Sequence, residues 1–429
     1  MIVRRIALNG FRNYDFETAD FDAGTNVICG ENAQGKTNLL EAVYMLAMGK
    51  SFRTRYDKEL VSFGSDGADI LADVYSHGRE QTVNLRLTPG KPKRILVNSV
   101  KKTAGELSDT VNTVLFCPDD LNLIKEGAAV RRRLMDNAIS QIRPRYAEIL
   151  SDFNKLYENK TRILKDWRDK PSLLDTLDEF SDGMARASAQ LIRYRAAFAN
   201  RLQEAAAPIH RDFSDGLEEL EIVYKTVSTV RDPFAPAKEI YYDICDHQER
   251  HRQAELDSAQ CLTGAHKDDL DIQINGRSAR SFASQGQTRT AALSMKLAER
   301  EILQAETGDM PILLLDDVLS ELDQKRQEFV LNRIGGGQTL ITCCEDEEIS
   351  LRTGGRVLLV SQFTLAAETS RGNRPGFDPA MPPEEAREFY EDLVSYARIT
   401  EPDTAFGEFG ADMKVALEND GPVTFLLRL

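Results

Sequence analysis

The chain has 429 residues, which is enough for more than one domain with a sizeable buried core. Its hydrophobic share of 41% and charged share of 29% are ordinary for a globular protein. It has no apolar run long enough to cross a membrane, and its first residues are not typical of a signal peptide. We therefore expect a cytoplasmic protein that does not contact membranes. Six cysteines without a CxxC pair indicate neither a zinc site nor a disulfide framework.

The net charge of −15, taken alone, argues against a nucleic-acid partner. Affinity for phosphate depends on local basic surface, however, and not on the sum of charges. Two basic clusters could form such a surface, the first being Lys91, Lys93, Arg94, Lys101 and Lys102 and the second being Arg131, Arg132 and Arg133. A solvated face of strands and turns is an equally good interpretation of the first cluster.

The first third of the chain reads mainly as strands. Residues 1–29 alternate polar and apolar positions, which predicts short strands that lead into a glycine-rich loop. The segment NLLEAVYMLAMG after the loop predicts a helix that ends at Gly49. Residues 60–116 contain further short alternating strands.

The pattern becomes helical and charged over residues 128–210, although these helices are too short for the arms of a long coiled-coil protein. Residues 217–276 mix strand-like and helical pieces. A second amphipathic helix is predicted over 284–306. The apolar run PILLLDDVLSELD at 311–323 is typical of a buried parallel strand that ends in acidic residues. The tail from about residue 350 is richer in Gly, Arg and Pro.

The loop between the first strands and helix fits the pattern GxxxxGK[ST]. In such a loop backbone N–H groups wrap a phosphate, Lys36 reaches the outer phosphates and the Thr37 hydroxyl binds Mg²⁺. A glycine-rich turn without a ligand is the alternative, but the strand before it and the helix after it favour a nucleotide site. The predicted loop residues are Gly30, Glu31, Asn32, Ala33, Gln34, Gly35, Lys36 and Thr37.

A site of this type also needs a carboxylate at the end of a neighbouring strand. The segment ILLLDD supplies Asp316 as the second magnesium-side residue beside Thr37, and Asp317 to polarise the attacking water. Consecutive acids at a strand end repel each other unless a cation is present, which favours function over structure. We expect Lys36 and Asp317 to be the catalytic residues.

A third motif precedes the second helix. Ser284, Gln285 and Gly286 form a turn whose hydroxyl and N–H groups could grip a γ-phosphate, although an ordinary helix cap explains it equally well. The order of loop, SQGQ and acid strand resembles ABC-type ATPases. The following segment, Ser320 to Asp323, matches the part of those proteins that touches the partner subunit. Because their signature segment closes over the other protomer's nucleotide, the resemblance implies an ATP-dependent homodimer with Asp323 at its contact.

A narrower resemblance is carried by a set of motifs in order: FRNY, GENAQGKTNLLEAVY, GKSFR, FCPDDLNLIKEG, GAHKDDL, SQGQTRT and LLLDDVLSELD. Together they resemble the RecF family of bacterial DNA-repair ATPases over about residues 1–348. The fold implied is α/β, with an ABC-type P-loop ATPase lobe of mixed sheet and flanking helices, an inserted and mostly helical second lobe, and a partial α+β segment at the C-terminus. We expect these parts at 1–115 with 262–350, at 116–261, and at 351–429.

The resemblance implies a function in recombinational repair and replication-fork restart, within the response to DNA damage and the SOS response. Dimers driven by ATP and Mg²⁺ would bind double-stranded and single-stranded DNA at gaps, helping RecO and RecR to load RecA. Hydrolysis would be weak, DNA-stimulated and used as a switch. Asp317 stands where most ABC-type enzymes have a longer glutamate, and the histidine that many of them carry after the next strand is absent, so turnover should be slow. Asp119, at the start of the inserted lobe, would sense nucleotide.

The tail resembles the second half of a D-aminoacyl-tRNA deacylase. Ser361 to Thr364 match the SQFT motif of that family, and Gly421 with Pro422 matches its Gly-Pro motif. The first half of that domain is missing, and half a closed sheet exposes unpaired edges. A bifunctional chain with deacylase activity is the alternative function. A nuclease subunit would need an added acidic metal cluster that the sequence does not offer, and His266 is interpreted as structural.

Overall fold

The computed structural model describes residues 1–29, 34–343, 358–359, 381–400, 405–407 and 409–410. The described residues up to Cys343 belong to one compact unit, and those from Leu358 onward belong to a second. Among the described residues, no helix has the combination of length and apolar character that spanning a membrane requires.

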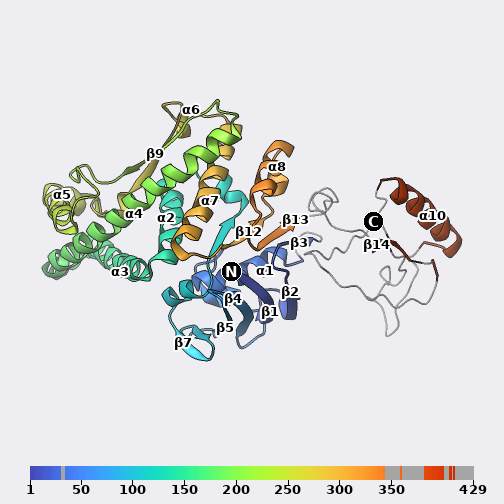
Figure 1. Ribbon diagram of the computed structural model, residues 1–429. Helices are drawn as coiled ribbons and strands as arrows, with labels where there is room; N and C mark the ends of the chain where they lie inside the picture. The colour runs from blue at the N-terminus through green and yellow to red at the C-terminus, as the bar shows by residue number, and fades with distance from the viewer. Residues whose placement is uncertain (30–33, 344–357, 360–380, 401–404, 408, 411–429) are drawn as a thin grey trace. The chain divides into compact units, whose positions relative to one another are not determined.

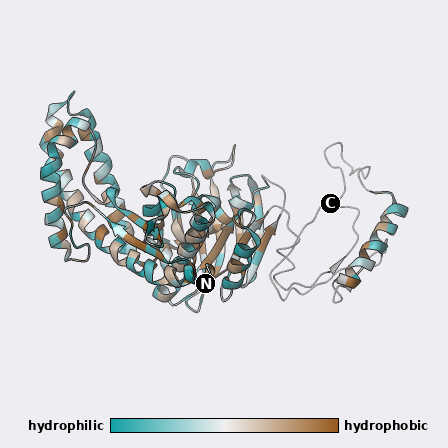
Figure 2. Cartoon of the chain, turned by 90° about the horizontal axis from the view of Figure 1, so that it is seen from above, coloured by the Kyte–Doolittle hydropathy of each residue, from teal (hydrophilic) through white to brown (hydrophobic). Residues whose placement is uncertain are grey.

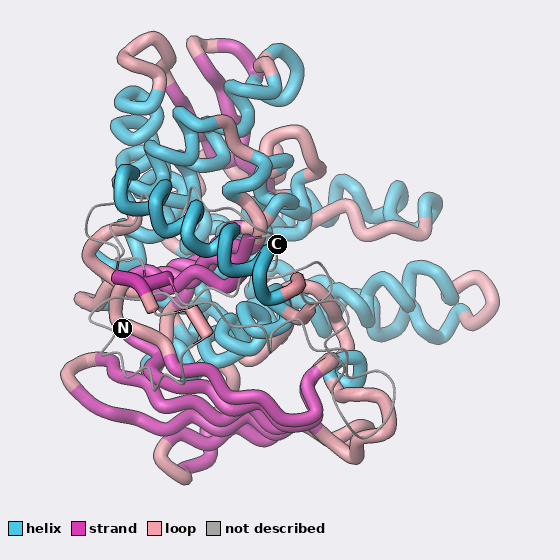
Figure 3. Tube along the Cα trace, turned by 90° about the vertical axis from the view of Figure 1, so that its right-hand side faces the viewer, coloured by secondary structure: helices cyan, strands magenta, loops and turns pink. Residues whose placement is uncertain are grey.

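A six-stranded antiparallel sheet forms one layer of the first unit (Figures 1 and 3). Its strand order is β2-β1-β4-β5-β6-β7. The strands are β1 (Ile2–Phe11), β2 (Tyr14–Asp20), β4 (Ala68–Ser76), β5 (Arg79–Leu87), β6 (Arg94–Val97) and β7 (Val100–Lys102). Buried residues alternate along β4 and β5, so one face of this sheet packs on the core, as the alternating sequence predicted.

A four-stranded parallel sheet forms the second layer, in the order β3-β13-β12-β8. Its strands are β3 (Thr25–Cys29), β8 (Thr113–Phe116), β12 (Ile312–Asp316) and β13 (Thr339–Cys343). Every residue of β12 is buried, as expected of a central strand that is covered on both faces. These strands are among the hydrophobic segments in Figure 2.

Helix α1 (Lys36–Met48) belongs to the hydrophobic core that also contains buried residues of β1, β4, β5 and β12. All its residues from Leu39 to Met48 are buried. The helix ends at Gly49 in the left-handed conformation with φ 61°, which confirms the predicted stop. The carboxyl end of β3 thus leads through the glycine-rich loop into a helix held on all sides.

The inserted part consists of long helices and a small antiparallel sheet of order β11-β10-β9. Its elements are α2 (Ala128–Ile142), α3 (Pro144–Asp166), α4 (Leu177–Phe213), β9 (Leu220–Lys225), α5 (Ala237–Ser258), β10 (Asp269–Ile274) and β11 (Arg277–Ser278). Strand β9 pairs with β10 from Leu220↔Ile274 to Lys225↔Asp269. This sheet therefore joins segments from both sides of the boundary that the sequence placed between residues 261 and 262.

The first unit also contains three further α-helices and several short 3₁₀ helices among its described residues. They are α6 (Ala279–Phe282), α7 (Gln285–Thr307) and α8 (Gln324–Arg333), with short 3₁₀ helices at Asp57–Leu60, Gly105–Asp109, Pro118–Asn122, Pro171–Thr176, Ala265–Lys267 and Leu319–Glu321. Helix α7 matches the predicted amphipathic helix. The second unit contains β14 (Leu358–Leu359), α10 (Pro383–Thr400) and β15 (Ala405–Phe406), and β14 pairs with β15 in parallel.

Candidate nucleotide-binding site

The glycine-rich loop enters α1 through Gly35. This residue caps the helix with φ 102°, a conformation that favours glycine. A Cβ atom added there would lie 2.7 Å from Tyr14 Oη, so the close approach also excludes a side chain. The Tyr14 hydroxyl donates to the Gly35 carbonyl at 2.9 Å, and the Asn13 amide lies 3.4 Å from the Gln34 carbonyl. The predicted residues Gly30, Glu31, Asn32 and Ala33 lie outside the described residues.

Lys36 and Thr37 are the first two residues of α1, where the helix dipole and backbone N–H groups favour an anion. Glu41, a residue of α1 with a fully buried side chain, anchors the helix to neighbouring segments. Arg12 binds this carboxylate with two hydrogen bonds of 2.8 and 2.7 Å, and the Ser51 hydroxyl donates to it at 2.5 Å. The FRNY, loop-helix and GKSFR motifs therefore meet at one buried carboxylate. The sequence showed each motif without showing this convergence.

The Thr37 hydroxyl lies against the first acid of the predicted pair. Its Oγ1 donates to Asp316 Oδ1 at 2.8 Å, and Thr342 Oγ1 donates to the same oxygen at 2.9 Å. Burial raises the pKa of Asp316 above its ordinary value, against the lowering effect of these two hydrogen bonds and of the Arg53 charge. A hydroxyl and a buried carboxylate on neighbouring elements are the hard oxygen ligands that suit Mg²⁺.

Asp317 takes an unusual backbone conformation immediately after β12. Its φ is 51°, in the left-handed region that aspartate tolerates better than most residues. Its backbone N–H donates to Thr342 Oγ1 at 2.9 Å, and the Ser320 hydroxyl lies 3.2 Å from its Oδ1. One threonine therefore orients both acids. Sequence reasoning missed Thr342, although parallel pairing of the two apolar strands places it opposite Asp316.

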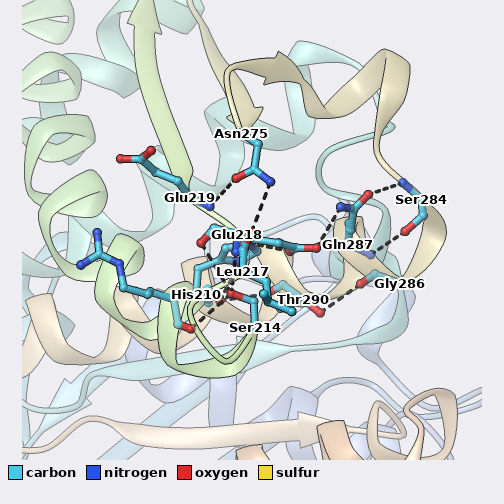
Figure 4. Close-up of polar contacts among 12 residues, drawn as sticks. His210, Ser214, Leu217, Glu218, Glu219, Asn275, Ser284, Gly286, Gln287 and Thr290 are labelled. Carbon is cyan, nitrogen blue, oxygen red and sulfur yellow. Dashed lines mark hydrogen bonds and ion pairs between the residues drawn. The ribbon is translucent and has the colours of Figure 1, made fainter.

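The signature residues lie at the start of α7 (Figure 4). Ser284 caps the helix: its Oγ accepts from Gln287 N at 3.2 Å, and its own N–H donates to Gln287 Oε1 at 2.9 Å. The helix-cap interpretation is thus confirmed, while Ser284 and Gln285 remain exposed. The Gln287 amide also donates to Glu218 at 2.8 Å, and the other oxygen of that carboxylate lies 3.0 Å from the His210 ring.

One arginine connects the signature with the predicted dimer-contact residue. Arg326 of α8 donates to the Gly286 carbonyl at 3.0 Å and to Thr290 Oγ1 at 3.1 Å, and it forms an ion pair with Asp323. Asp323 itself caps α8 by accepting from Arg326 N at 3.0 Å. Sequence reasoning missed Arg326, which gave no signal in a region rich in charged residues.

The predicted residues therefore form two groups within one chain. The first lies at the carboxyl edge of the parallel sheet and the second at the N-termini of α7 and α8. The first group is Lys36, Thr37, Asp316 and Asp317, and the second is Ser284, Gln285, Gly286 and Asp323.

Several other polar motifs have structural roles. Arg131, from the second basic cluster, is buried and binds Asp269 with hydrogen bonds of 2.6 and 3.0 Å. Arg131 is therefore not part of a free basic surface, whereas Arg133 of the same cluster is exposed. Burial lowers the pKa of His266 to about 4, and its Nε2 lies 2.9 Å from the Cys261 carbonyl, in keeping with a structural histidine. Asp119 is exposed, whereas its neighbour Asp120 accepts from Cys117 N.

No group of three or more His, Cys, Asp or Glu side chains could hold a metal ion in the described part of the chain.

The parallel sheet, the loop that enters a buried helix, the acids on the adjacent strand and the serine-capped helix together define the fold of an ABC-type P-loop ATPase. A family model described as "RecF/RecN/SMC N terminal domain" matches residues 2–353. The DNA replication and repair protein RecF of Acetivibrio thermocellus is 40% identical over 361 residues, which cover 84% of this chain and 98% of that protein. RecF of Bacillus mycoides is 39% identical over 377 residues, covering 86% and 100%. The chain therefore belongs to the RecF family of DNA replication and repair proteins.

Solved structures agree with this assignment. One described as the recombination mediator protein RecF-ATPrS in the RecFOR pathway has a TM-score of 0.76 and 35% sequence identity, covering 81% of this chain and 93% of that one. A second, described as RecF-ATP in the same pathway, has a TM-score of 0.74 and 34% identity, covering 81% and 92%.

A different family model, "D-Tyr-tRNA(Tyr) deacylase", matches residues 342–428. This match agrees with the resemblance of the tail. The motif residues Ser361, Gln362, Phe363, Thr364, Gly421 and Pro422 lie outside the described residues.

Proposed function

We propose that this chain binds and slowly hydrolyses ATP with Mg²⁺, and that ATP closes two copies into a dimer on DNA during recombinational repair and fork restart. The observation that carries the proposal is the joint contact of Thr37 and Thr342 with Asp316, beside the loop that enters α1. The likeness to a solved structure of RecF with ATP supports the choice of nucleotide.

Within this site each residue has a separate task. Thr37 and Asp316 would hold Mg²⁺, which when bound neutralises phosphate charge. Lys36 lies beside them at the start of α1, where it can bind the outer phosphates. The Asp317 carboxylate would orient the attacking water, and Ser320 restrains it at 3.2 Å. Because aspartate is one methylene shorter than glutamate, this water should be held less well and hydrolysis should be slow.

The second group of residues would act on the partner's nucleotide. Ser284 and Gln285 are exposed at the positive end of α7, and Arg326 with Asp323 fixes that end to α8. An exposed and braced helix start suits an anion supplied by another molecule. We therefore assign Ser284, Gln285 and Gly286 to the γ-phosphate in trans and Asp323 to the dimer contact.

The DNA partners and the cellular role follow the family. We propose that the dimer binds double-stranded and single-stranded DNA at gaps, that DNA stimulates its ATPase, and that it acts with RecO and RecR to load RecA in the response to DNA damage. The similar solved structures are described as RecF of the RecFOR pathway, which supports these partners. The cytoplasmic location and the domain boundaries stay predictions.

Mixing two inactive variants tests the composite site. Lys36→Ala and Ser284→Arg proteins should each lack ATPase activity, because each dimer would have two defective sites. Their equimolar mixture should regain roughly a quarter of the wild-type rate, since about half the dimers are mixed and each mixed dimer has one intact site of two. Ser151→Arg, at an exposed position of α3, should be fully active alone. A mixture that stays inactive contradicts the proposal.

A second candidate function rests on the family match over residues 342–428. We propose as this second function that the tail hydrolyses the ester of D-tyrosyl-tRNA. Incubating the purified full chain with D-tyrosyl-tRNA and measuring the released D-tyrosine tests this directly. Release at the spontaneous rate would leave the ATPase as the chain's activity.

A further inference from the structure

A groove in the helical lobe gathers cations that the nucleotide site does not use. It has a volume of about 980 Å³ and is lined by residues of α3, α4, α5 and the segment before α5. Four of its lining residues are cationic, namely Arg145, Arg186, Arg193 and Lys238, and no described residue that lines it is acidic. The chain as a whole is acidic, with a net charge of −15, so this concentration of positive charge is local.

Helix geometry explains why the cations face one space. Arg186, Gln190, Arg193 and Ala197 follow one another at intervals of four, three and four residues, so they form one stripe of α4. On α5, Lys238 and Tyr242 are four residues apart and share a face in the same way. The groove is thus formed by stripes of two long helices, with Arg145 from the start of α3 at its edge.

Within the described residues, three of these cations have no carboxylate partner. No ion pair among the described residues involves Arg145, Arg193 or Lys238. Arg186 is different, since it binds Asp182 at 2.8 Å. All four side chains belong to exposed residues, and most of the other arginines on these helices do have partners, so the groove keeps an excess of positive charge for an external anion.

Aromatic rings line the same groove. Phe234 is 56% exposed and Tyr242 is 58% exposed, so both rings are accessible to an external ligand. Tyr241 also lines the groove: its ring carries the Arg186 guanidinium 5.0 Å above it and meets the Tyr242 ring edge-on at 5.3 Å. The Tyr241 hydroxyl donates to Asp182 at 2.5 Å, which fixes the orientation of this ring.

Cations and exposed rings in one groove are the chemistry that recognises single-stranded nucleic acid. Its phosphates bind arginine and lysine, and its unstacked bases lie on aromatic faces. An acidic peptide would use the cations but leave the rings without a partner. A duplex keeps its base faces covered. We propose that the groove between α3, α4 and α5 binds single-stranded DNA. The inference rests on the proposed function in DNA repair and assigns the single strand to a surface separate from the nucleotide site.

Fluorescence anisotropy with a fluorescein-labelled oligothymidylate and the full chain tests this inference. Arg193→Glu should weaken binding at least about tenfold, because it replaces a phosphate contact by a repulsive charge. Its matched control is Arg162→Glu on α3, whose side chain is 80% exposed outside the groove. Phe234→Ala should weaken binding roughly 5- to 100-fold, the effect of losing one base stack. Its control is Phe16→Ala on β2, where the ring is 69% exposed. Both controls should bind like the wild type.

Salt provides an independent readout. With three or four phosphate contacts, the logarithm of the affinity should fall with the logarithm of salt concentration at a slope of about −2 to −3, and Arg193→Glu should make this slope shallower. Groove variants that bind oligothymidylate like the wild type would overturn the inference. So would a wild type that fails to bind it at low salt, or displacement by polyglutamate together with an unaffected Phe234→Ala protein, which would indicate an acidic peptide instead.

The same variants separate this inference from the proposed function. Arg193→Glu and Phe234→Ala should keep the wild-type ATPase rate and ATP-dependent binding of plain duplex, because the groove contains none of the nucleotide-site residues. Loss of duplex binding by the wild type itself would count against the proposed function. If the groove variants keep wild-type binding of single-stranded DNA, the inference about the groove is wrong, while the proposed function is unaffected.

Discussion

Replacing Thr342 by valine should disturb the candidate site while keeping the shape of the side chain. The hydroxyl donates to Asp316 at 2.9 Å and accepts from the backbone N–H of Asp317 at 2.9 Å. Thr342 is only 1% exposed, so water cannot readily replace either bond. The variant would therefore leave one carboxylate with fewer donors and one buried N–H without an acceptor.

The expected loss of stability follows from these two bonds. A hydrogen bond to a charged group contributes about 1.5–3 kcal/mol and a neutral one about 0.5–1.5 kcal/mol, so the variant should lose about 2–4 kcal/mol.

The hydrogen bond from Thr342 lowers the pKa of Asp316, whereas burial raises it above 3.8, so the substitution should raise that pKa further. Because the pKa of Asp316 is higher in the folded protein than in the unfolded chain, protonation of this carboxyl adds to the free energy of unfolding. This added stability is complete below pH 3.8 and is lost as the pH rises through the folded pKa. The substitution should therefore lower the free energy of unfolding more at pH 7 than in acid. As the pH is lowered, the variant should lose its affinity for Mg²⁺ at a higher pH than the wild type does.

The matched control lies on the same strand. Thr339 is fully buried, and its hydroxyl has no hydrogen-bond partner in the part of the chain that the structure describes. Thr339→Val should therefore be neutral or stabilising. Urea unfolding followed by circular dichroism, together with the affinity for a fluorescent ATP analogue in Mg²⁺, gives both quantities for each variant. Equal losses in the two variants would refute the reasoning, because they would show that the Thr342 hydrogen bonds contribute nothing specific.

Gly35→Ala should abolish ATP binding and lower the unfolding midpoint more than Gly64→Ala, because a Cβ at Gly35 meets Tyr14 whereas nothing lies within 4 Å of one at Gly64; similar midpoints would contradict this. The pKa of His266 falls from 6.5 to about 4 on folding, so the neutral ring opposes protonation and stability should drop as the pH falls between those values, by roughly 3 kcal/mol in total. His266→Phe should reduce the slope of stability against pH in this window, and an unchanged slope would show that the ring is accessible to protons. The Arg326→Lys protein should bind ATP normally but dimerise and hydrolyse ATP poorly, because lysine lacks the planar fork that reaches both the Gly286 carbonyl and Thr290. A wild-type ATPase rate in this variant would show that these contacts of Arg326 are not needed.

Local patterns in the sequence predicted the parts of the fold that depend on neighbouring residues. The apolar run before Asp316 predicted a buried parallel strand, and the structure has β12 there with every residue buried. Gly49 predicted the end of α1, because the left-handed conformation at that position favours glycine. The motif order predicted the family without any knowledge of distances.

Contacts between distant segments could not be predicted in the same way. The meeting of Thr342 with Asp316 depends on the register of β13 against β12, and the brace of Arg326 on Gly286 depends on how α8 packs against α7. The basic clusters show the same limit. Arg131 lies in the most basic triplet of the chain, yet it is buried against Asp269.

The groove of the helical lobe, by contrast, is lined by cations from three separate helices. Arg145 belongs to α3, Arg193 to α4 and Lys238 to α5, so none of them stands out in the sequence. Only the packing of those helices brings the positive charges together.

Sedimentation velocity of the full chain, with and without a non-hydrolysable ATP analogue and Mg²⁺, tests the central claim most directly. Without nucleotide the protein should be monomeric, and with saturating analogue it should be dimeric. Wild-type protein that stays monomeric at saturating analogue would contradict the composite site.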